Sequence, residues 1–149
     1  MKQRPSHLAL VLGGGSGERF GSKVPKQYKV LAGKPLIAHC LQTLNASPEV
    51  DEIFVVAKAG TAEEMKRILI DYGITKARAV MDGGSTRKQS VRIALKYLAD
   101  SKTPAESLLL IQDGDRPNLT EELIKENFEL AEKKGAVVTA IPVSDSVFY

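Results

Sequence analysis

The sequence is poor in the residues that staple small domains or build nucleic-acid sites. It has one cysteine, Cys40, so no internal disulfide can form. Only 5% of its 149 residues are aromatic, and they are not interleaved with basic residues as in nucleic-acid-binding modules. No apolar run approaches the roughly 20 residues of a membrane span, and the short run 8–12 leads straight into glycines, unlike the core of a signal peptide. We therefore expect a cytoplasmic domain with neither nucleic acid nor membrane as a partner.

Two common nucleotide motifs are also missing. No Gly-Lys-Ser or Gly-Lys-Thr occurs, which excludes a Walker A loop. The dinucleotide fingerprint requires a third glycine where this chain has Glu18 or Phe20, and only a stretched version ending at Gly21 remains. The second predicted strand ends at Ala57-Lys58, without an acid to hold a ribose. A nicotinamide-dependent oxidoreductase is thus a weaker alternative.

Charge is distributed unevenly along the chain. The net charge is only +3, but residues 1–35 carry seven cations against one acid, Glu18, a local balance of +6. His7 and His39 are not paired for acid–base or metal chemistry, and Cys40 is predicted to be a small buried residue of a helix. The basic segment favours a polyanionic small molecule as the ligand.

Strand-like and helix-like segments alternate along the whole chain. This alternation predicts one α/β domain over 1–149, with a Rossmann-like, doubly wound, mostly parallel sheet covered by helices on both faces. In a Rossmann-like order, the first and fourth strands are neighbours. The helix from Thr61 has a capping-box pattern with Glu64 and a stop at Gly73. The other predicted helices are 35–44, 85–98 with Leu95 facing inward, and 120–134; the predicted strands are 7–12, 53–57, 77–81, 108–111 and 137–141.

A glycine cluster follows the first predicted strand, with Arg19 and the triplet Pro25-Lys26-Gln27 beyond it. Glycine backbones let amide groups close around an anion, and nearby cations neutralise it. The stretch therefore predicts a phosphate-binding loop rather than a simple flexible turn. Its glycines are Gly13, Gly14, Gly15, Gly17 and Gly21.

Two further segments follow predicted strands. Asp113 begins a turn that runs to Pro117, and one carboxylate there can hold Mg²⁺ together with substrate phosphates, although a plain Asp-Gly turn capped by Arg116 is nearly as good a reading. Gly83 to Ser90 offers small residues with amides and hydroxyls that can read the edge of a base, although Ser85 alone is also typical of a helix N-cap. Together, the three segments indicate a metal-dependent nucleotide site at the carboxyl ends of the strands.

With these segments in hand, the chain resembles the cytidylyltransferases that act on sugar-alcohol phosphates, above all those of 2-C-methyl-D-erythritol 4-phosphate. The resemblance runs in family order from residue 8 to the end. It is carried by the glycine loop with Arg19, by Pro25-Lys26-Gln27 followed by Tyr28, and by the segments 83–90, 113–117 and 142–146.

The resemblance implies a reaction and a role for each matching residue. CMP would pass from CTP to the sugar-alcohol phosphate, with Mg²⁺ as cofactor and pyrophosphate as product. Arg19 and Lys26 would stabilise the transition state, and Asp113 would ligate the metal. The resemblance also implies a homodimer, because the segment at Asp145-Ser146 serves the neighbouring subunit's site. The nucleotide-binding residues would be Gly13, Gly14, Gly15, Gly17, Gly84, Ser85, Ser90 and Gly114, and the acceptor-binding residues Arg116, Asp145 and Ser146.

Three departures from the family pattern keep alternatives open. Gly13-Gly14-Gly15 replaces the usual Ala-Ala-Gly. Asp115 adds a second acid whose charge repels phosphates unless a metal offsets it. Family members also continue for roughly half this length again, so we expect a C-terminally truncated domain, weak in transfer compared with a form extended past Tyr149. The alternatives are a ribitol-5-phosphate cytidylyltransferase and a truncated nucleotide-binding module with little activity.

Overall fold

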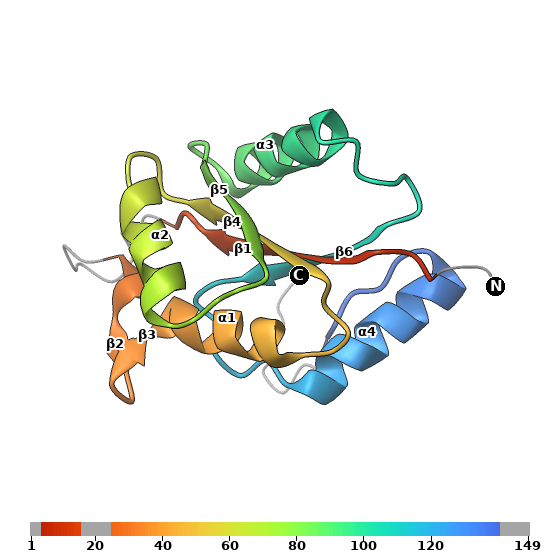
Figure 1. Cartoon of the computed structure of the whole chain (residues 1–149), viewed down its shortest axis with the longest axis horizontal. Helices are drawn as coiled ribbons and strands as arrows, with labels where there is room; N and C mark the ends of the chain where they lie inside the picture. The colour runs from red at the N-terminus through yellow and green to blue at the C-terminus, as the bar shows by residue number, and fades with distance from the viewer. Residues whose placement is uncertain (1–3, 16–24, 141–149) are drawn as a thin grey trace, which may run out of the picture.

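A computed structural model describes residues 4–15 and 25–140 (Figure 1). Its centre is a parallel sheet of strands β1 (His7–Gly13), β4 (Glu52–Ala57), β5 (Ala77–Asp82) and β6 (Leu108–Asp113). The strand order is β5-β4-β1-β6, and every pairing in it is parallel. The first predicted strand therefore lies between the second and the fourth, which confirms the Rossmann-like order.

The two central strands carry apolar side chains on both faces. Ala9 and Val11 of β1 belong to one core, whereas Leu8 and Leu10 belong to the other. Successive side chains of a strand point to opposite faces, so a continuous apolar run is expected where both faces are covered. These short runs of consecutive apolar residues thus reflect burial on both sides.

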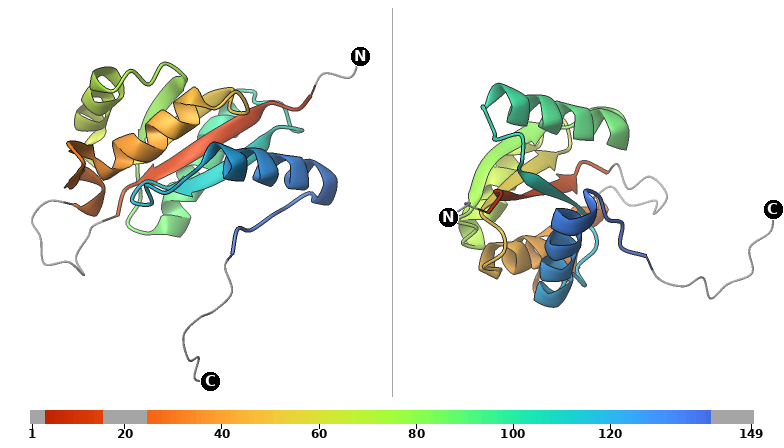
Figure 2. Two further views of the ribbon diagram at one scale, coloured as in Figure 1. Left: turned by 90° about the horizontal axis from the view of Figure 1, so that it is seen from below. Right: turned by 90° about the vertical axis from the view of Figure 1, so that its right-hand side faces the viewer.

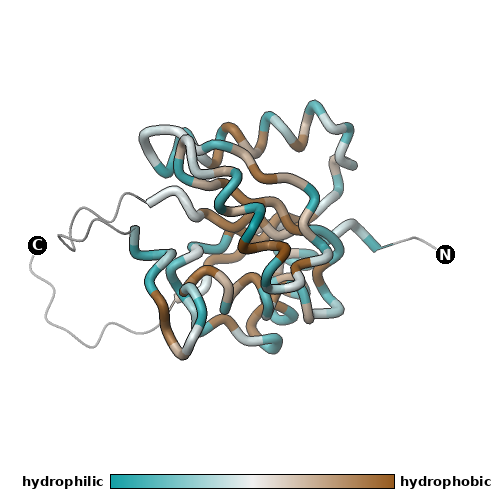
Figure 3. Tube along the Cα trace, turned by 60° about the vertical axis from the view of Figure 1, so that its left-hand side comes forward, coloured by the Kyte–Doolittle hydropathy of each residue, from teal (hydrophilic) through white to brown (hydrophobic). Residues whose placement is uncertain are grey.

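Helices cover both faces of the sheet (Figure 2). On one face lie α1 (Leu36–Ala46), α2 (Ala62–Asp71) and α4 (Glu121–Lys134), and on the other lies α3 (Arg87–Asp100). The apolar segments gather in the interior between these layers (Figure 3). Cys40 of α1 is fully buried, as predicted, but Leu95 of α3 is 48% exposed, so its predicted inward orientation is wrong. The doubly wound α/β architecture is confirmed.

The helix ends follow local chemistry in some places and not in others. Thr120 caps α4 by accepting a hydrogen bond from the Leu123 amide (3.2 Å), and Gly135 ends the helix with φ of 84°. Thr86, rather than Ser85, caps α3. The predicted capping box at Thr61 is wrong, because its hydroxyl makes no cap bond and donates instead to the Lys58 carbonyl oxygen.

Two further differences from the predicted elements concern irregular parts of the chain. Residues 137–140 form no strand, while residue 141 lies outside the described part. A strand requires a neighbour for its backbone groups, and Val138 is instead 88% exposed. Between β1 and α1, the structure adds the short helix η2 (Lys26–Tyr28) and a hairpin of β2 (Val30–Leu31) with β3 (Lys34–Pro35). Within the described residues, no helix is both long and apolar enough to cross a membrane.

Candidate functional site

Three of the predicted segments meet along one edge of the sheet. Leu12 of β1 is in register with Asp113 of β6, and Ala57 of β4 is in register with Asp82 of β5. Beyond the strand ends, the Gly114 amide donates to the Leu12 carbonyl oxygen (2.9 Å), and the Gly83 amide donates to that of Ala57 (2.8 Å). The glycine loop, the Asp113 turn and the 83–90 segment therefore converge, as the strand order predicted.

Close packing explains why several positions in these segments are occupied by glycine. A Cβ atom on Gly13 or Gly114 would lie 2.8 or 2.9 Å from Cδ1 of Ile37, in the first turn of α1. A Cβ on Gly83 would lie 2.9 Å from the Ala57 carbonyl oxygen, a backbone atom that cannot turn away. A Cβ on Gly15 would meet nothing within 4 Å. Ile37 thus packs beneath both the glycine loop and the Asp113 turn, while Gly15 faces open space.

Asp113, the predicted metal ligand, is held between two arginines. Its Oδ1 atom lies 3.0 Å from the guanidinium of Arg87, and its Oδ2 atom lies 3.0 Å from that of Arg116. Arg116 also closes the turn through its amide, which donates to the Asp113 carbonyl oxygen (3.2 Å). The turn capped by Arg116 is therefore present, and Arg116 is at the site for which an acceptor-binding role was predicted.

Lys26, a predicted catalytic cation, lies at this same edge. Its Nζ atom is 3.0 Å from Oδ2 of Asp115, and both side chains are partly exposed. Asp115 was expected to repel phosphates, and in the structure its charge is compensated by Lys26. The short helix η2 thereby connects the segment after the glycine loop to the Asp113 turn.

Sequence reasoning assigned no role to three residues that organise the site. Arg87 joins α3 to Asp113, as described above. Gln27 is buried and its amide donates to the Gly13 and Gly15 carbonyl oxygens. Gln112 donates similarly to the carbonyl oxygens of Asp113 and Arg116 (3.1 and 3.3 Å). All three lie within or beside the predicted motifs, and this position was the only signal in the sequence that could have identified them. Their partners depend on the fold.

The predicted cytosine-reading residues lie together at the start of α3. Ser90 is buried, and its hydroxyl oxygen accepts a hydrogen bond from the Gly84 amide (3.2 Å). The amide and hydroxyl of Ser85 both donate to Oε1 of Gln89 (2.9 and 2.7 Å). These hydrogen bonds hold the 83–90 segment in shape. A base that bound here would have to share their donor groups or replace their present acceptors.

The donor set around Asp113 is compatible with Mg²⁺ only if phosphates supply further ligands. The described residues contain no group of three or more histidine, cysteine or acidic side chains that could hold a metal. Magnesium, however, is commonly bound through one or two carboxylates with substrate phosphates and waters. Asp113 fits as that single carboxylate, provided that a phosphate takes over its guanidinium partners.

Four predicted site residues lie outside the described part of the chain: Gly17, Arg19, Asp145 and Ser146.

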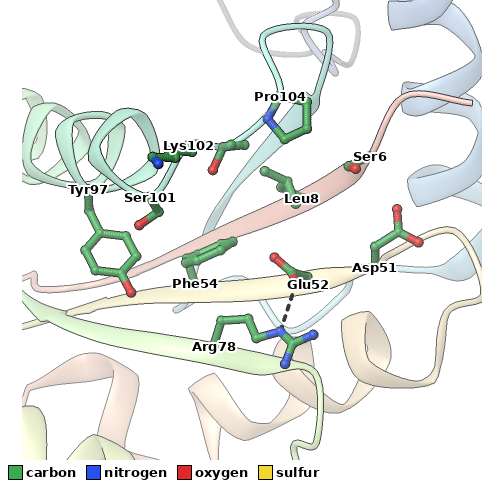
Figure 4. Close-up of a pocket in the computed structure, with 11 residues that line it drawn as sticks. Ser6, Leu8, Asp51, Glu52, Phe54, Arg78, Tyr97, Ser101, Lys102 and Pro104 are labelled. Atoms are coloured by element: carbon green, nitrogen blue, oxygen red, sulfur yellow. Dashed lines mark hydrogen bonds and ion pairs between the residues drawn. The ribbon is translucent and has the colours of Figure 1, made fainter.

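A separate hollow of about 500 Å³ lies at the opposite end of the sheet (Figure 4). Leu8 and Phe54 lie within it, and the Arg78 guanidinium contacts Glu52 at 2.8 Å. None of the predicted site residues lines this hollow.

Comparison with known proteins agrees with this geometry. The family model of 2-C-methyl-D-erythritol 4-phosphate cytidylyltransferase matches residues 8–149. An Alkaliphilus metalliredigens cytidylyltransferase of that name is 37% identical over 93% of this chain and 56% of its own length. A Lacticaseibacillus paracasei ribitol-5-phosphate cytidylyltransferase is 33% identical over 94% of this chain and 59% of its own.

A solved structure is also similar. The crystal structure of 4-diphosphocytidyl-2C-methyl-D-erythritol synthase from Anaerococcus prevotii matches with a TM-score of 0.78 and 29% identity, over 96% of this chain and 58% of that one. The chain thus spans somewhat more than half the length of the relatives it matches. From the family match, the fold and the convergent segments, the chain belongs to the 2-C-methyl-D-erythritol 4-phosphate cytidylyltransferase family.

Proposed function

We propose that this chain carries the nucleotide half of a cytidylyltransferase that transfers CMP from CTP to 2-C-methyl-D-erythritol 4-phosphate. The main support is the convergence of the glycine loop, Lys26 and Asp113 at the carboxyl edge of the sheet. Ligands of open α/β sheets bind at this edge, beside the point where the strand order reverses. Here that point lies between β1 and β6, because the chain runs from β1 through β4 to β5 on one side of β1 and then crosses to β6 on the other.

The proposed reaction is an in-line phosphoryl transfer. An oxygen of the acceptor phosphate forms a bond to the α-phosphorus of CTP as the bond to the β-phosphate oxygen breaks, which releases pyrophosphate. Little covalent chemistry is required of the protein in such transfers, so positioning and electrostatic stabilisation carry catalysis. Amides of the glycine loop would bind the phosphates, while Lys26 and Arg19 would offset the charge that develops on them. Mg²⁺, when bound, would neutralise part of the triphosphate charge, and Asp113 would hold it.

Binding would require the ion pairs of the site to exchange partners. Lys26 contacts Asp115, and Arg87 and Arg116 contact Asp113. A triphosphate entering between these groups would take Lys26 from Asp115 and the arginines from Asp113. Partly exposed ion pairs contribute about 0–1 kcal/mol each, so a polyanion can displace them.

Ribitol 5-phosphate is the alternative acceptor. The Lacticaseibacillus paracasei relative is a ribitol-5-phosphate cytidylyltransferase, and its identity to this chain is close to that of the methylerythritol-phosphate enzymes. Both acceptors are sugar-alcohol phosphates, and Arg116, Asp145 and Ser146 are the proposed contacts for the acceptor molecule. We also propose that the whole protein is cytoplasmic. A homodimer is proposed as well, because in the family the segment that matches residues 145–146 serves the neighbouring subunit's site.

Product analysis tests the proposed function. The chain is incubated with CTP and Mg²⁺ and with either acceptor, and the products are identified by ³¹P NMR and mass spectrometry. The expected products are the CDP-alcohol of 2-C-methyl-D-erythritol and pyrophosphate in equal amounts. The Lys26→Ala variant should lower kcat and kcat/KM together by about a hundredfold. Product from ribitol 5-phosphate alone would reassign the acceptor, and absence of product from both acceptors would refute transferase activity of this chain.

A further inference from the structure

We infer that Gln27 is a positioning residue that sets which way the peptide groups of the glycine loop face. The inference rests on the proposed function, because it concerns the loop that would bind the CTP phosphates. Gln27 is 3% exposed, although its side chain is polar. Its Nε2 atom lies 2.5 Å from the Gly13 carbonyl oxygen and 3.2 Å from that of Gly15. A carboxamide NH₂ has two hydrogens, so one side chain can donate to both oxygens.

The short helix η2 holds Gln27 in place. The Tyr28 amide donates to the Pro25 carbonyl oxygen (3.0 Å), and the Lys29 amide donates to that of Lys26 (3.1 Å). The flanking side chains are also engaged: Lys26 contacts Asp115, and the Tyr28 hydroxyl contacts that of Thr61 at the start of α2 (3.1 Å). Contacts of the residues on both sides of Gln27 therefore hold its side chain in place, whereas the residues to which that side chain donates, Gly13 and Gly15, are glycines.

The geometry of the peptide bond links this contact to phosphate binding. In a planar trans peptide, the carbonyl oxygen and the following N–H point in opposite directions. When Gln27 binds the Gly13 carbonyl, the Gly14 N–H points away from Gln27 and is left to face a ligand. Glycine has little backbone preference of its own. Without Gln27, the loop could turn these carbonyl oxygens toward the anion, where they would repel it.

The nature of the side chain matters as much as its size. Methionine at position 27 would fill similar space but leave two carbonyl oxygens without their donor. Glutamate would place an ionised carboxylate against both oxygens. A protonated glutamic acid regains one O–H donor, and burial raises the pKa of a carboxyl group. Anion binding by Gln27→Glu should thus recover partly as the pH falls, whereas Gln27→Met should not recover.

Calorimetry with CTP and with inorganic pyrophosphate tests the inference. The Kd of both probes should rise about tenfold or more in Gln27→Met, as expected when a hydrogen-bonded positioning contact is lost. In Gln27→Glu, the Kd at pH 5.5 should approach that of the parent chain at the same pH. Gln42→Met and Gln42→Glu are matched controls, because the Gln42 amide also donates to a carbonyl oxygen, that of Tyr72 (3.5 Å), but on α1 away from the site.

A second measurement does not depend on the folding of any variant. In ¹H–¹⁵N NMR spectra of the parent chain, the Gln27 side-chain amide should be protected from solvent exchange, and CTP should shift the Gly14 amide more than the Gly13 amide. Rapid exchange of that side chain, or unchanged affinity in Gln27→Met, would overturn the inference while leaving the proposed function intact. Failure of the parent chain to bind either probe would refute the proposed function itself.

Discussion

At the scale of single residues, the site consists of oppositely charged side chains that form ion pairs with one another. Lys26 with Asp115, and Asp113 with Arg87 and Arg116, form ion pairs at distances of 3.0 Å. Asp113 and Asp115 carry two negative charges against three positive ones on their partners. In the proposed function, a nucleotide would therefore compete with the two carboxylates for these cations, and Asp115 is the carboxylate that departs from the family pattern.

Replacing Asp115 by asparagine should strengthen CTP binding. The substitution keeps the size of the side chain and removes a negative charge beside Lys26. Because the pair is partly exposed, a gain of about two- to fivefold in affinity is expected, and it should shrink at high salt. Isothermal calorimetry measures it, with Asp100→Asn at the far end of α3 as the control. Weaker binding in Asp115→Asn would instead make Asp115 part of the ligand site.

The sequence predicted the residues with strong local signals and missed those whose role depends on a distant partner. Asp113 comes at the end of an apolar run that predicts a strand, and it precedes glycine, so its place at the sheet edge could be predicted. Arg87 contacts it across 26 positions, and Gln27 contacts Gly13 across 14. No local pattern specifies such pairs, because the fold alone determines which segments meet.

At the scale of elements, the helices with both a periodic apolar face and a terminal signal were predicted best. The helix α4 begins after Thr120 and ends at Gly135, as expected. Residues 137–140 of the strand predicted at 137–141 form no strand, because a strand depends on a partner that its own sequence does not encode. The hairpin of β2 and β3 was missed for a related reason, since its turn at Ala32-Gly33, with φ of 48° and 82°, carries only one glycine.

The cap of α4 gives a stability prediction at this scale. The Thr120 hydroxyl oxygen accepts a hydrogen bond from the Leu123 amide, which would otherwise have no partner within the helix. Thr120→Ala should lower the free energy of unfolding by about 1 kcal/mol, and Thr120→Ser should retain most of it. Urea denaturation measures both values. Equal losses in the two variants would show that the hydroxyl does not stabilise the helix.

At the scale of the whole molecule, one sheet separates two apolar cores of unequal size. Cys40 belongs to the larger core, between the sheet and α1. Burial raises the pKa of its thiol to about 12, whereas the pKa of an exposed cysteine thiol is about 8.5. The folded state therefore keeps a proton that the unfolded state loses in alkaline solution.

This difference predicts how stability depends on pH. Below about pH 8.5, the Cys40 thiol is protonated in both the folded and the unfolded state, so it does not change how the free energy of unfolding depends on pH. Above it, the unfolded state binds fewer protons, so the free energy of unfolding should fall by about 1 kcal/mol per pH unit from this group. Chemical denaturation between pH 8 and pH 10 measures the slope, and Cys40→Ala should make it shallower. The same slope in both proteins would contradict the assigned burial.

The most direct test of the whole account is nucleotide selectivity. The melting temperature of the chain is measured with Mg²⁺ and equal concentrations of CTP, UTP, ATP, GTP or NADH. A ligand that binds only the folded state at about 100 times its Kd adds about 2.7 kcal/mol of stability. CTP should therefore raise the melting temperature by several degrees and by more than any other ligand tested. Equal shifts for all nucleotides, or the largest shift with NADH, would contradict a cytidylyltransferase site.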